Sequence, residues 1–170
     1  MPEIAAASAW VLAVVVAAAI VHRFVAFAVV VQSESMRPSL QPGDVILAGR
    51  ARRRTRLRRG EILVYRDADA GDRRIRRLIA LPGDHVEIGD DGAVTVDGDP
   101  LFEPYARRTG GFRGAFTVPG DRCFVLSDQR AGAHDARSWQ GSFVPLADVV
   151  GVARVRLLPW PIAPTGVLAR

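Results

Sequence analysis

The sequence predicts a mainly β domain that follows one N-terminal transmembrane helix. Three observations lead to this fold class: an uncharged apolar run near the N-terminus, short segments rich in β-branched and aromatic residues after it, and Pro-Gly, Gly-Asp and Asp-Gly turn signals between those segments. The chain has 170 residues, of which 49% are apolar, and this favours one domain with a real core over two domains.

The apolar run extends from Ile4 to Val21 and has 18 residues without a charge. As a helix it would span about 27 Å, close to the hydrocarbon thickness of a bilayer. A cleavable secretory signal is the alternative, although the preceding Met-Pro-Glu lacks the positive charge usual there. We expect a membrane anchor helix over residues 1–23 that ends with the interfacial His22 and Arg23. Charge leaves its orientation open, because domains of this length translocate largely regardless of charge.

The β domain is expected over residues 24–170, where no segment after residue 32 has a helical period. Three similar Pro-Gly-Asp segments mark turns, and common turn chemistry explains them better than an internal repeat. The strands are expected at residues 24–32, 44–49, 61–66, 75–81, 85–88, 93–98, 122–127 and 148–158.

The positive charge of the chain is concentrated in one segment. All 23 basic residues are arginine, and residues 50–60, RARRRTRLRRG, hold seven of them without an acid. The net charge of +5 becomes 5 − 7 = −2 without this segment, so we expect no nucleic-acid partner for the chain as a whole. The segment itself is either a solvated loop or a patch for anionic lipid or nucleic acid.

The cysteine and histidine content argues against an internal disulfide and against a metal site. The single Cys123 excludes an internal disulfide. Three scattered histidines and one cysteine do not have the spacing of a metal site, so no metal is expected.

The segment 31–40, VQSESMRPSL, contains a candidate nucleophile in Ser35. Ser35 follows the expected end of a strand, where a side chain can project into a cleft. A serine hydroxyl needs a base to remove its proton and preorganised donors for the oxyanion that forms. If the segment stays extended, Ser33 shares the face of Ser35 and could be such a donor. The motif alone is a weak signal, because most serines are surface hydroxyls.

The surrounding motifs make the signal specific. The strings SESMRPSLQPGDVIL, GEILVYR, IRRLIALPGDHV, SDQRAGAHDARSW and FVP follow one another in this order after the apolar run. Together they resemble the bacterial type I signal peptidases from the anchor to about residue 160. The resemblance implies a signal-peptidase-type β domain and a membrane-bound serine endopeptidase that removes signal peptides from exported preproteins. It also implies a Ser/Lys dyad, no cofactor, and an active site at the outer membrane surface.

The first motif matches the family pattern S-x-S-M-x-P-T-L. The resemblance implies that Ser35 is the nucleophile, that Ser33 is the side-chain oxyanion donor, and that the backbone N–H of Ser35 is the second donor. Met36 and Pro38 match the turn after the nucleophile, and Ser39 replaces the usual threonine but keeps a hydroxyl.

The fourth motif matches the family's G-D-N-R block. Asp128 and Arg130 fall in this block, while Asp135 and Arg137 match a downstream pair that braces the catalytic region in the family. A buried carboxylate–guanidinium pair would orient neighbouring groups rather than react. The alternative is a structural salt bridge without a functional consequence.

The general base departs from the family pattern. The lysine of K-R-x-x-G-L-P-G-D corresponds to Arg76 in this chain. Arginine is effectively always protonated and cannot accept the proton of Ser35, whereas a buried lysine can. A cationic Arg76 could still lower the pKa of a neighbour or hold an oxyanion.

A partner of the missing lysine is absent too, because Ala133 stands where the family has a serine. The next residue, His134, adds an imidazole whose ordinary pKa is near neutral, and His85 follows a Pro-Gly-Asp turn. His134 is a possible substitute base and His85 a weaker one. Both are otherwise ordinary surface or turn histidines.

Two classes of function follow from these matches and losses. The first is an active peptidase with an unorthodox base, acting on signal peptides or dedicated to one pro-protein. The second is a non-catalytic protein that binds signal peptides or a partner peptidase. We expect a single-pass protein of the cell membrane, with the catalytic domain on the extracytoplasmic side, whose partners are preproteins and lipid. A soluble self-cleaving repressor-type protease is disfavoured by the membrane span.

Overall fold

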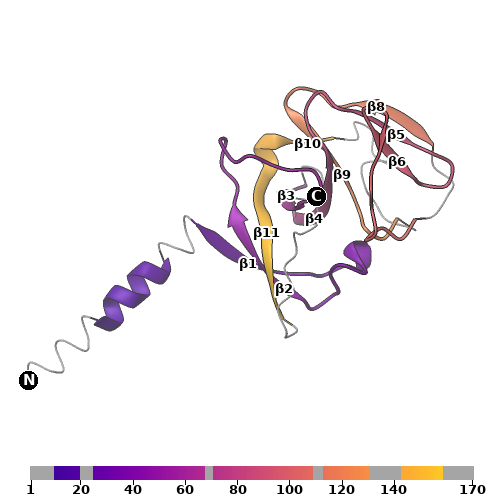
Figure 1. Cartoon of the computed structure of the whole chain (residues 1–170). Helices are drawn as coiled ribbons and strands as arrows, with labels where there is room; N and C mark the ends of the chain where they lie inside the picture. The colour runs from indigo at the N-terminus through magenta and orange to yellow at the C-terminus, as the bar shows by residue number, and fades with distance from the viewer. Residues whose placement is uncertain (1–9, 20–24, 68–70, 109–112, 131–142, 159–170) are drawn as a thin grey trace, which may run out of the picture.

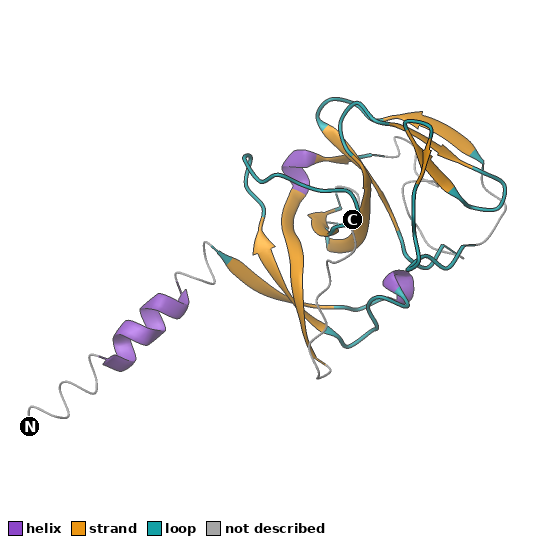
Figure 2. Ribbon diagram, viewed as in Figure 1, coloured by secondary structure: helices purple, strands orange, loops and turns teal. Residues whose placement is uncertain are grey.

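The computed structural model describes residues 10–19, 25–67, 71–108, 113–130 and 143–158, and the statements below concern these residues. Outside a helix at residues 10–19, two short 3₁₀ helices occur among them, η1 (Glu34–Met36) and η2 (Leu146–Asp148), and strands make up the regular structure. Figure 2 shows this predominance of strands. The expectation of a mainly β protein is confirmed.

A seven-stranded sheet carries most of the domain (Figure 1). All of its strand pairs are antiparallel, which suits short connections between neighbouring segments. In spatial order it contains β1 (Ala26–Val30), β2 (Val45–Arg50), β11 (Val149–Leu158), β3 (Ile62–Arg66), β4 (Arg73–Ala80), β9 (Arg122–Leu126) and β10 (Val144–Pro145).

A smaller four-stranded antiparallel sheet follows β4 along the chain. Figure 1 shows it at the end of the molecule farthest from the N-terminal helix. Its spatial order is β7 (Asp99–Pro100), β6 (Val94–Val96), β5 (His85–Ile88) and β8 (Gly114–Thr117).

The core forms because apolar residues alternate along the strands. Ile62 and Val64 of β3 pack in one cluster, while Leu63 and Tyr65 of the same strand pack in another, so both faces of β3 are buried. A third cluster joins the two sheets, with Phe124 of β9 packed among the valines of β5 and β6. The site described below therefore rests on strands buried on both faces.

Two of the expected Pro-Gly-Asp turns share one construction. Gly43 and Gly83 have φ angles of 92° and 89°, which favour glycine. The following aspartates close the turns: Asp44 Oδ2 accepts from the N–H of Gln41 at 2.9 Å, and Asp84 Oδ2 accepts from that of Leu81 at 2.6 Å. Local hydrogen bonding thus explains the recurrence of this tripeptide without a structural repeat.

The N-terminal segment contains an exposed helix at residues 10–19. In the part of the chain that the structure describes, no helix is long and apolar enough to cross a membrane. The expected anchor also includes residues on both sides of this helix that lie outside the described residues. The anchor therefore stays a prediction.

Each of the eight expected strands matches a strand of the structure to within a few residues. Three short strands were missed, namely β7, β8 and β10. β7 and β10 contain two residues each and include a proline, so neither has a detectable alternation.

Candidate active site

The local fold positions Ser35 at the start of the chain's first turn after β1. The chain leaves β1 at Val30, remains extended at Ser33, and then forms the 3₁₀ helix η1. Met36 and Leu40 are buried, and the N–H of Leu40 donates to the carbonyl of Met36 at 2.8 Å. This apolar side of the turn fixes the backbone, so Ser35 stays half-buried while Ser33 is exposed.

The structure brings the three residues expected in the site together. Ser33 Oγ lies 2.9 Å from Ser35 Oγ, and Nη1 of Arg76 donates to Ser35 Oγ at 2.8 Å. The same nitrogen also donates to the carbonyl of Ile75 at 2.8 Å. Ser35 and Arg76 are 41 positions apart in the sequence, so the folding of β4 beside η1 creates this contact.

The hydrogen-bond chemistry sets the direction of this contact. A guanidinium has only donors, so Ser35 Oγ accepts from Arg76. The hydroxyl proton of Ser35 is then available to Ser33 or to a ligand, and Arg76 cannot take it. The arrangement can stabilise negative charge at Ser35, but the described residues beside it do not include the lysine that would deprotonate the hydroxyl.

Backbone bonds tie this serine turn to the segment that follows β9. The N–H of Gln129 donates to the carbonyl of Ser35 at 2.9 Å. The adjacent Asp128 accepts through its carbonyl from the N–H of Arg107 at 2.8 Å. The segment that contains Asp128 and Arg130, which is expected to support the site, is therefore joined to Ser35 by a main-chain hydrogen bond.

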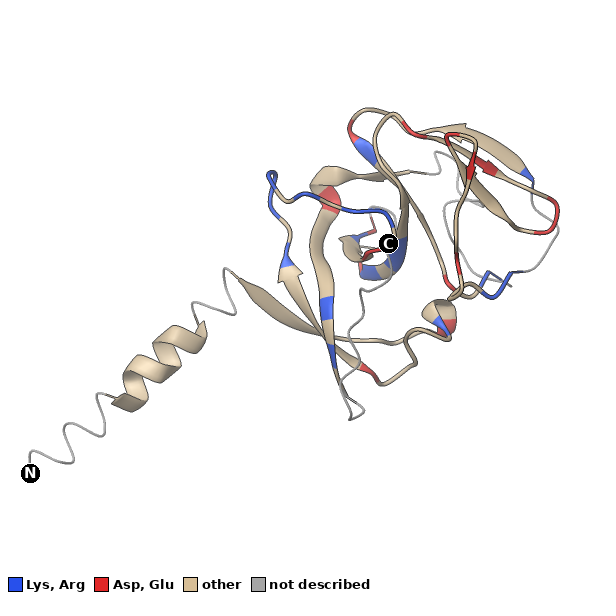
Figure 3. Cartoon of the chain, viewed as in Figure 1, with Lys and Arg blue, Asp and Glu red and all other residues tan. Residues whose placement is uncertain are grey.

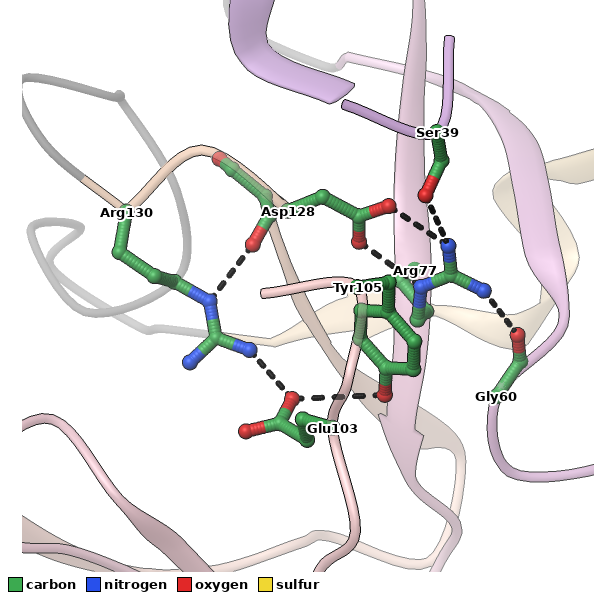
Figure 4. A network of polar contacts seen from close by, with 8 residues as sticks. Ser39, Gly60, Arg77, Glu103, Tyr105, Asp128 and Arg130 are labelled. Carbon is green, nitrogen blue, oxygen red and sulfur yellow. Dashed lines mark hydrogen bonds and ion pairs between the residues drawn. The ribbon is translucent and has the colours of Figure 1, made fainter. Parts of the chain in front are cut away.

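Arg77 is the centre of a buried polar network next to this turn (Figure 4). Its Nε and Nη2 donate to the two carboxylate oxygens of Asp128 at 2.8 and 2.6 Å, which is the bidentate geometry of a strong pair. Nη1 donates to the carbonyl of Gly60 at 2.7 Å, and Nη2 also donates to Ser39 Oγ at 3.0 Å. The hydroxyl that Ser39 keeps at the usual threonine position thus has a structural partner.

A second buried pair extends the network, between Arg130 and Glu103. Nε of Arg130 also donates to the carbonyl of Ser127. The ring of Tyr105 covers the guanidinium of Arg77, whose carbon lies 3.8 Å from the ring centroid, and its hydroxyl donates to Glu103 at 3.4 Å. Burial, and then the neighbouring Glu103 carboxylate, raise the pKa of Tyr105, so the phenol stays neutral in this network.

The expected supporting residues have partners that the sequence did not indicate. Asp128 pairs with Arg77, and Arg130 pairs with Glu103. Arg77 was visible as the second residue of the K-R-x-x-G-L-P-G-D pattern, whereas Glu103 and Tyr105 lie in a segment without a motif. No sequence signal could have found these two.

The other expected site residues divide into two groups. His85 lies on β5, where its ring contacts Thr117 Oγ1 at 3.3 Å and Glu87 at 3.4 Å, as an ordinary surface histidine would. Ala133, His134, Asp135 and Arg137 lie outside the described residues.

A metal site receives no support from the described side chains. No group of three or more histidine, cysteine, aspartate or glutamate residues among them could hold an ion. Burial raises the pKa of Cys123 to about 12, so this thiol stays protonated in the core of the larger sheet.

Comparison with known proteins gives the same family from sequence and from structure. The family model described as signal peptidase, peptidase S26, matches residues 4–160. A probable signal peptidase I-2 from Synechocystis sp. is 37% identical over 87% of this chain and 69% of that protein. A signal peptidase I from Leptolyngbya laminosa is 34% identical over 87% of this chain and 75% of that protein.

A solved structure is also similar to this chain. It is a crystal structure of a signal peptidase I from Enterococcus faecalis V583, with a TM-score of 0.50 and 29% sequence identity. The match covers 58% of this chain and 97% of the other chain.

Proposed function

The chain belongs to the signal peptidase family S26, and from this premise we propose that it is a membrane-anchored serine endopeptidase that cleaves signal peptides from exported preproteins. Family membership implies a peptidase of the signal peptidase type. The serine mechanism, the residues that carry it and the membrane anchor are parts of the proposal.

One observation carries the proposed mechanism. Ser35 Oγ and Arg76 Nη1 lie 2.8 Å apart, at the two positions that match the family's nucleophile and general base. The hydroxyl of Ser33, 2.9 Å from Ser35 Oγ, is near enough to donate to an oxyanion that forms on the substrate carbonyl. The geometry therefore supports Ser35 as the nucleophile and Ser33, with the N–H of Ser35, as the oxyanion donors.

Arg76 has a different role from the lysine that it replaces. Its permanent charge favours the alkoxide form of Ser35 and the developing oxyanion, but another group has to accept the proton. We assign that role to His134, whose imidazole can accept a proton near neutral pH. Asp128 and Arg130 support the site through their pairs with Arg77 and Glu103. Asp135 and Arg137 match the bracing pair of the family in sequence, and we assign them the same supporting role.

The proposed membrane topology follows from the apolar run at residues 4–21. This run is long enough to cross a bilayer as one helix. The domain after residue 24 would then lie on the extracytoplasmic side, where exported preproteins present their signal peptides.

A second candidate function is supported by the same hydrogen bond. Arg76 donates a hydrogen bond to Ser35 Oγ, the oxygen that would have to attack the substrate. While the Ser35 hydroxyl keeps its proton, this bond lowers the electron density on the oxygen and makes it a weaker nucleophile. A site of this kind can bind a signal peptide without cutting it. The chain would then be a non-catalytic binder of signal peptides or of a partner peptidase. A peptidase dedicated to one pro-protein is a narrower form of the first proposal.

The experiment that tests the proposal is processing of a preprotein by the purified full chain in detergent. The substrate carries small residues at −3 and −1 from the scissile bond, and product is quantified by gel and mass spectrometry. We expect slow cleavage by the wild type and a loss of at least a hundredfold in Ser35→Ala, because the nucleophile is removed. Cleavage at an unchanged rate in this variant would end the assignment of Ser35.

Two further variants separate the enzyme from the binder. Arg76→Lys should raise turnover, and the rate should increase with pH as the buried lysine loses its proton. Arg73→Lys is the matched control on the same strand and should leave turnover unchanged. His134→Ala should abolish the slow wild-type activity. Tight peptide binding without cleavage in the wild type and in Arg76→Lys would favour the non-catalytic protein.

A further inference from the structure

The arginine loop, which we define as residues 51–61 between β2 and β3, lies where the chain enters the larger sheet. Pairing of β1 with β2 places Ala26 opposite Gly49, and the N–H of Arg50 donates to the carbonyl of Val25 at 2.8 Å. Figure 3 shows this loop in blue on the side of the sheet where β1 begins. The segment with the highest density of positive charge therefore begins next to Val25, the first described residue before β1.

The proposed anchor brings this loop to the membrane surface. Arg23 ends the anchor, and the two residues from Arg23 to Val25 span at most about 7 Å even when fully extended. This distance is shorter than the Debye length of about 8 Å at physiological ionic strength, within which the potential of an anionic leaflet acts on basic side chains. The position of Val25 thus brings the first residues of the loop within reach of lipid headgroups.

The loop is held so that its arginines point outward. Ala51 and Leu57 pack against the core cluster of β3, and the N–H of Ala51 donates to the carbonyl of Val150 at 3.0 Å. A turn closed by Thr55, whose Oγ1 accepts from the N–H of Arg52 at 2.8 Å, fixes the tip. The exposed arginines of the loop are Arg52, Arg53, Arg54, Arg56, Arg58 and Arg59.

Internal ion pairs use only part of this charge. Arg59 contacts Asp84 and Asp97 at 2.8 and 3.0 Å. Glu61, the acid at the end of the loop, lies 2.9 Å from Arg154. Arg53, Arg54 and Arg56 take part in no ion pair among the residues that the structure describes. These three side chains remain available to an external anion.

Exposed acidic residues gather on the four-stranded sheet. Figure 3 shows red segments on the four-stranded sheet, away from the N-terminal helix. Its exposed acids that have no ion pair with the loop are Glu87, Asp90, Asp91 and Asp99, whereas Asp97 contacts Arg59. This separation of charge would turn the arginine loop toward an anionic surface and the smaller sheet away from it.

We propose that the arginine loop binds the phosphates of anionic lipid headgroups and fixes the orientation of the domain on the membrane. Guanidinium groups suit this ligand because their planar donors bind phosphate oxygens in pairs. The proposal rests on the membrane anchor of the proposed function, but it does not depend on whether the serine site is catalytic.

The test uses the full chain in lipid nanodiscs of phosphatidylcholine, with or without 30% phosphatidylglycerol, and trypsin as the probe. Trypsin has to take an arginine side chain into its own pocket, so a guanidinium bound to phosphate is protected. We expect phosphatidylglycerol to slow cleavage after Arg53, Arg54 and Arg56 about fivefold relative to cleavage after Arg107 and Arg108, and 0.5 M salt to remove the difference. Equal protection of both regions, or none, overturns the proposal.

A measurement without protease uses two variants that each lose three positive charges. Phosphatidylglycerol should raise the Tm of the wild type and of the control Arg107→Gln/Arg108→Gln/Arg113→Gln, and should not raise that of Arg53→Gln/Arg54→Gln/Arg56→Gln. If both variants lose the rise in Tm equally, the effect depends on net charge alone, and the proposal is contradicted.

Two controls separate this proposal from its alternatives. Resistance of the chain to carbonate extraction reports the anchor by itself, so a chain that is extracted refutes the anchor, whereas an integrated chain with an unprotected loop refutes only the lipid contact. A short DNA duplex is added in a parallel digestion. Protection by DNA without protection by phosphatidylglycerol would assign the loop to nucleic acid and overturn the lipid proposal.

Discussion

Arg76 and Arg77 are neighbours on β4, and both are buried, yet their surroundings use the guanidinium group differently. Arg77 engages three nitrogens at once, with the carboxylate of Asp128, the carbonyl of Gly60 and the hydroxyl of Ser39. Arg76 meets the serine site through one nitrogen, Nη1, which donates to Ser35 Oγ and to Ile75 O. The contacts of Arg77 need a planar fork, whereas the contact with Ser35 needs a single cationic donor.

This difference separates a structural arginine from a functional position. The environment of Arg77 matches the geometry of arginine, so the residue is required for the fold. The contact of Arg76 with Ser35 is one that a lysine ammonium can also make, so arginine at this position affects the chemistry of the site more than its architecture. Changes at Arg77 should therefore mainly lower the stability of the fold, whereas changes at Arg76 should mainly alter the activity.

The largest effect on stability is expected for Arg77→Met. This change leaves the carboxylate of Asp128 buried without its partner, at a cost of about 3–5 kcal/mol. Urea unfolding followed by far-UV circular dichroism measures it. Arg77→Met combined with Asp128→Leu should recover part of the loss, because no charge is then left unpaired. A loss below about 1 kcal/mol in the single variant would remove the distinction between the two arginines.

Lysine substitutions should show an intermediate and unequal effect. Arg77→Lys keeps the charge but loses the fork that joins Asp128, Gly60 and Ser39, so we expect a loss of about 2–3 kcal/mol in the free energy of unfolding. Arg76→Lys can keep its contact with Ser35, so its cost should be smaller than that of Arg77→Lys. Equal losses in the same urea assay would show that both sites depend on arginine geometry.

The smallest expected effect is seen in the titration of Tyr65. Burial raises the pKa of Tyr65 to about 12 from 10.0, and the charge of Arg76 opposes this rise. Arg76→Met should therefore raise the pKa of Tyr65 further. Absorbance at 295 nm measures this shift in a Tyr105→Phe background, which leaves one phenol.

The same raised pKa sets a pH dependence of stability. The contribution of Tyr65 is complete below pH 10.0 and is lost as the pH rises toward 12, because the unfolded chain gives up its phenolic proton first. The loss at pH 11 should be about 1 kcal/mol. A flat stability between pH 10 and pH 11.5 would contradict the burial of this phenol.

Much of the fold was predictable because its signals are local. The alternation along β3 and the Pro-Gly-Asp turns at Gly43 and Gly83 come from the preferences of neighbouring residues. β7 and β10 were not predictable, because two residues hold no period and only pairing with a partner strand makes them extended. The anchor, although it has the strongest signal in the sequence, remains a prediction.

The candidate site shows the same division. Ser33, Ser35 and Arg76 were identified from their motifs, and the structure brings them within hydrogen-bonding distance. Glu103 and Tyr105 were not identified, because a single acidic and a single aromatic residue in an irregular segment carry no pattern. Their roles depend on contacts with Arg130 and Arg77, which lie 27 or more positions away in the sequence.

The sequence by itself determined the kinds of groups available: a serine pair, an arginine where a base was expected, and one concentrated positive segment. Side-chain chemistry and local backbone preferences are properties of single residues and their neighbours, so they can be read without a fold. Tertiary structure alone decided that Arg76 donates to Ser35 while Arg77 pairs with Asp128, and that the arginine loop lies beside the start of β1. These choices depend on strand order and register, which bring distant segments together and which no local pattern specifies.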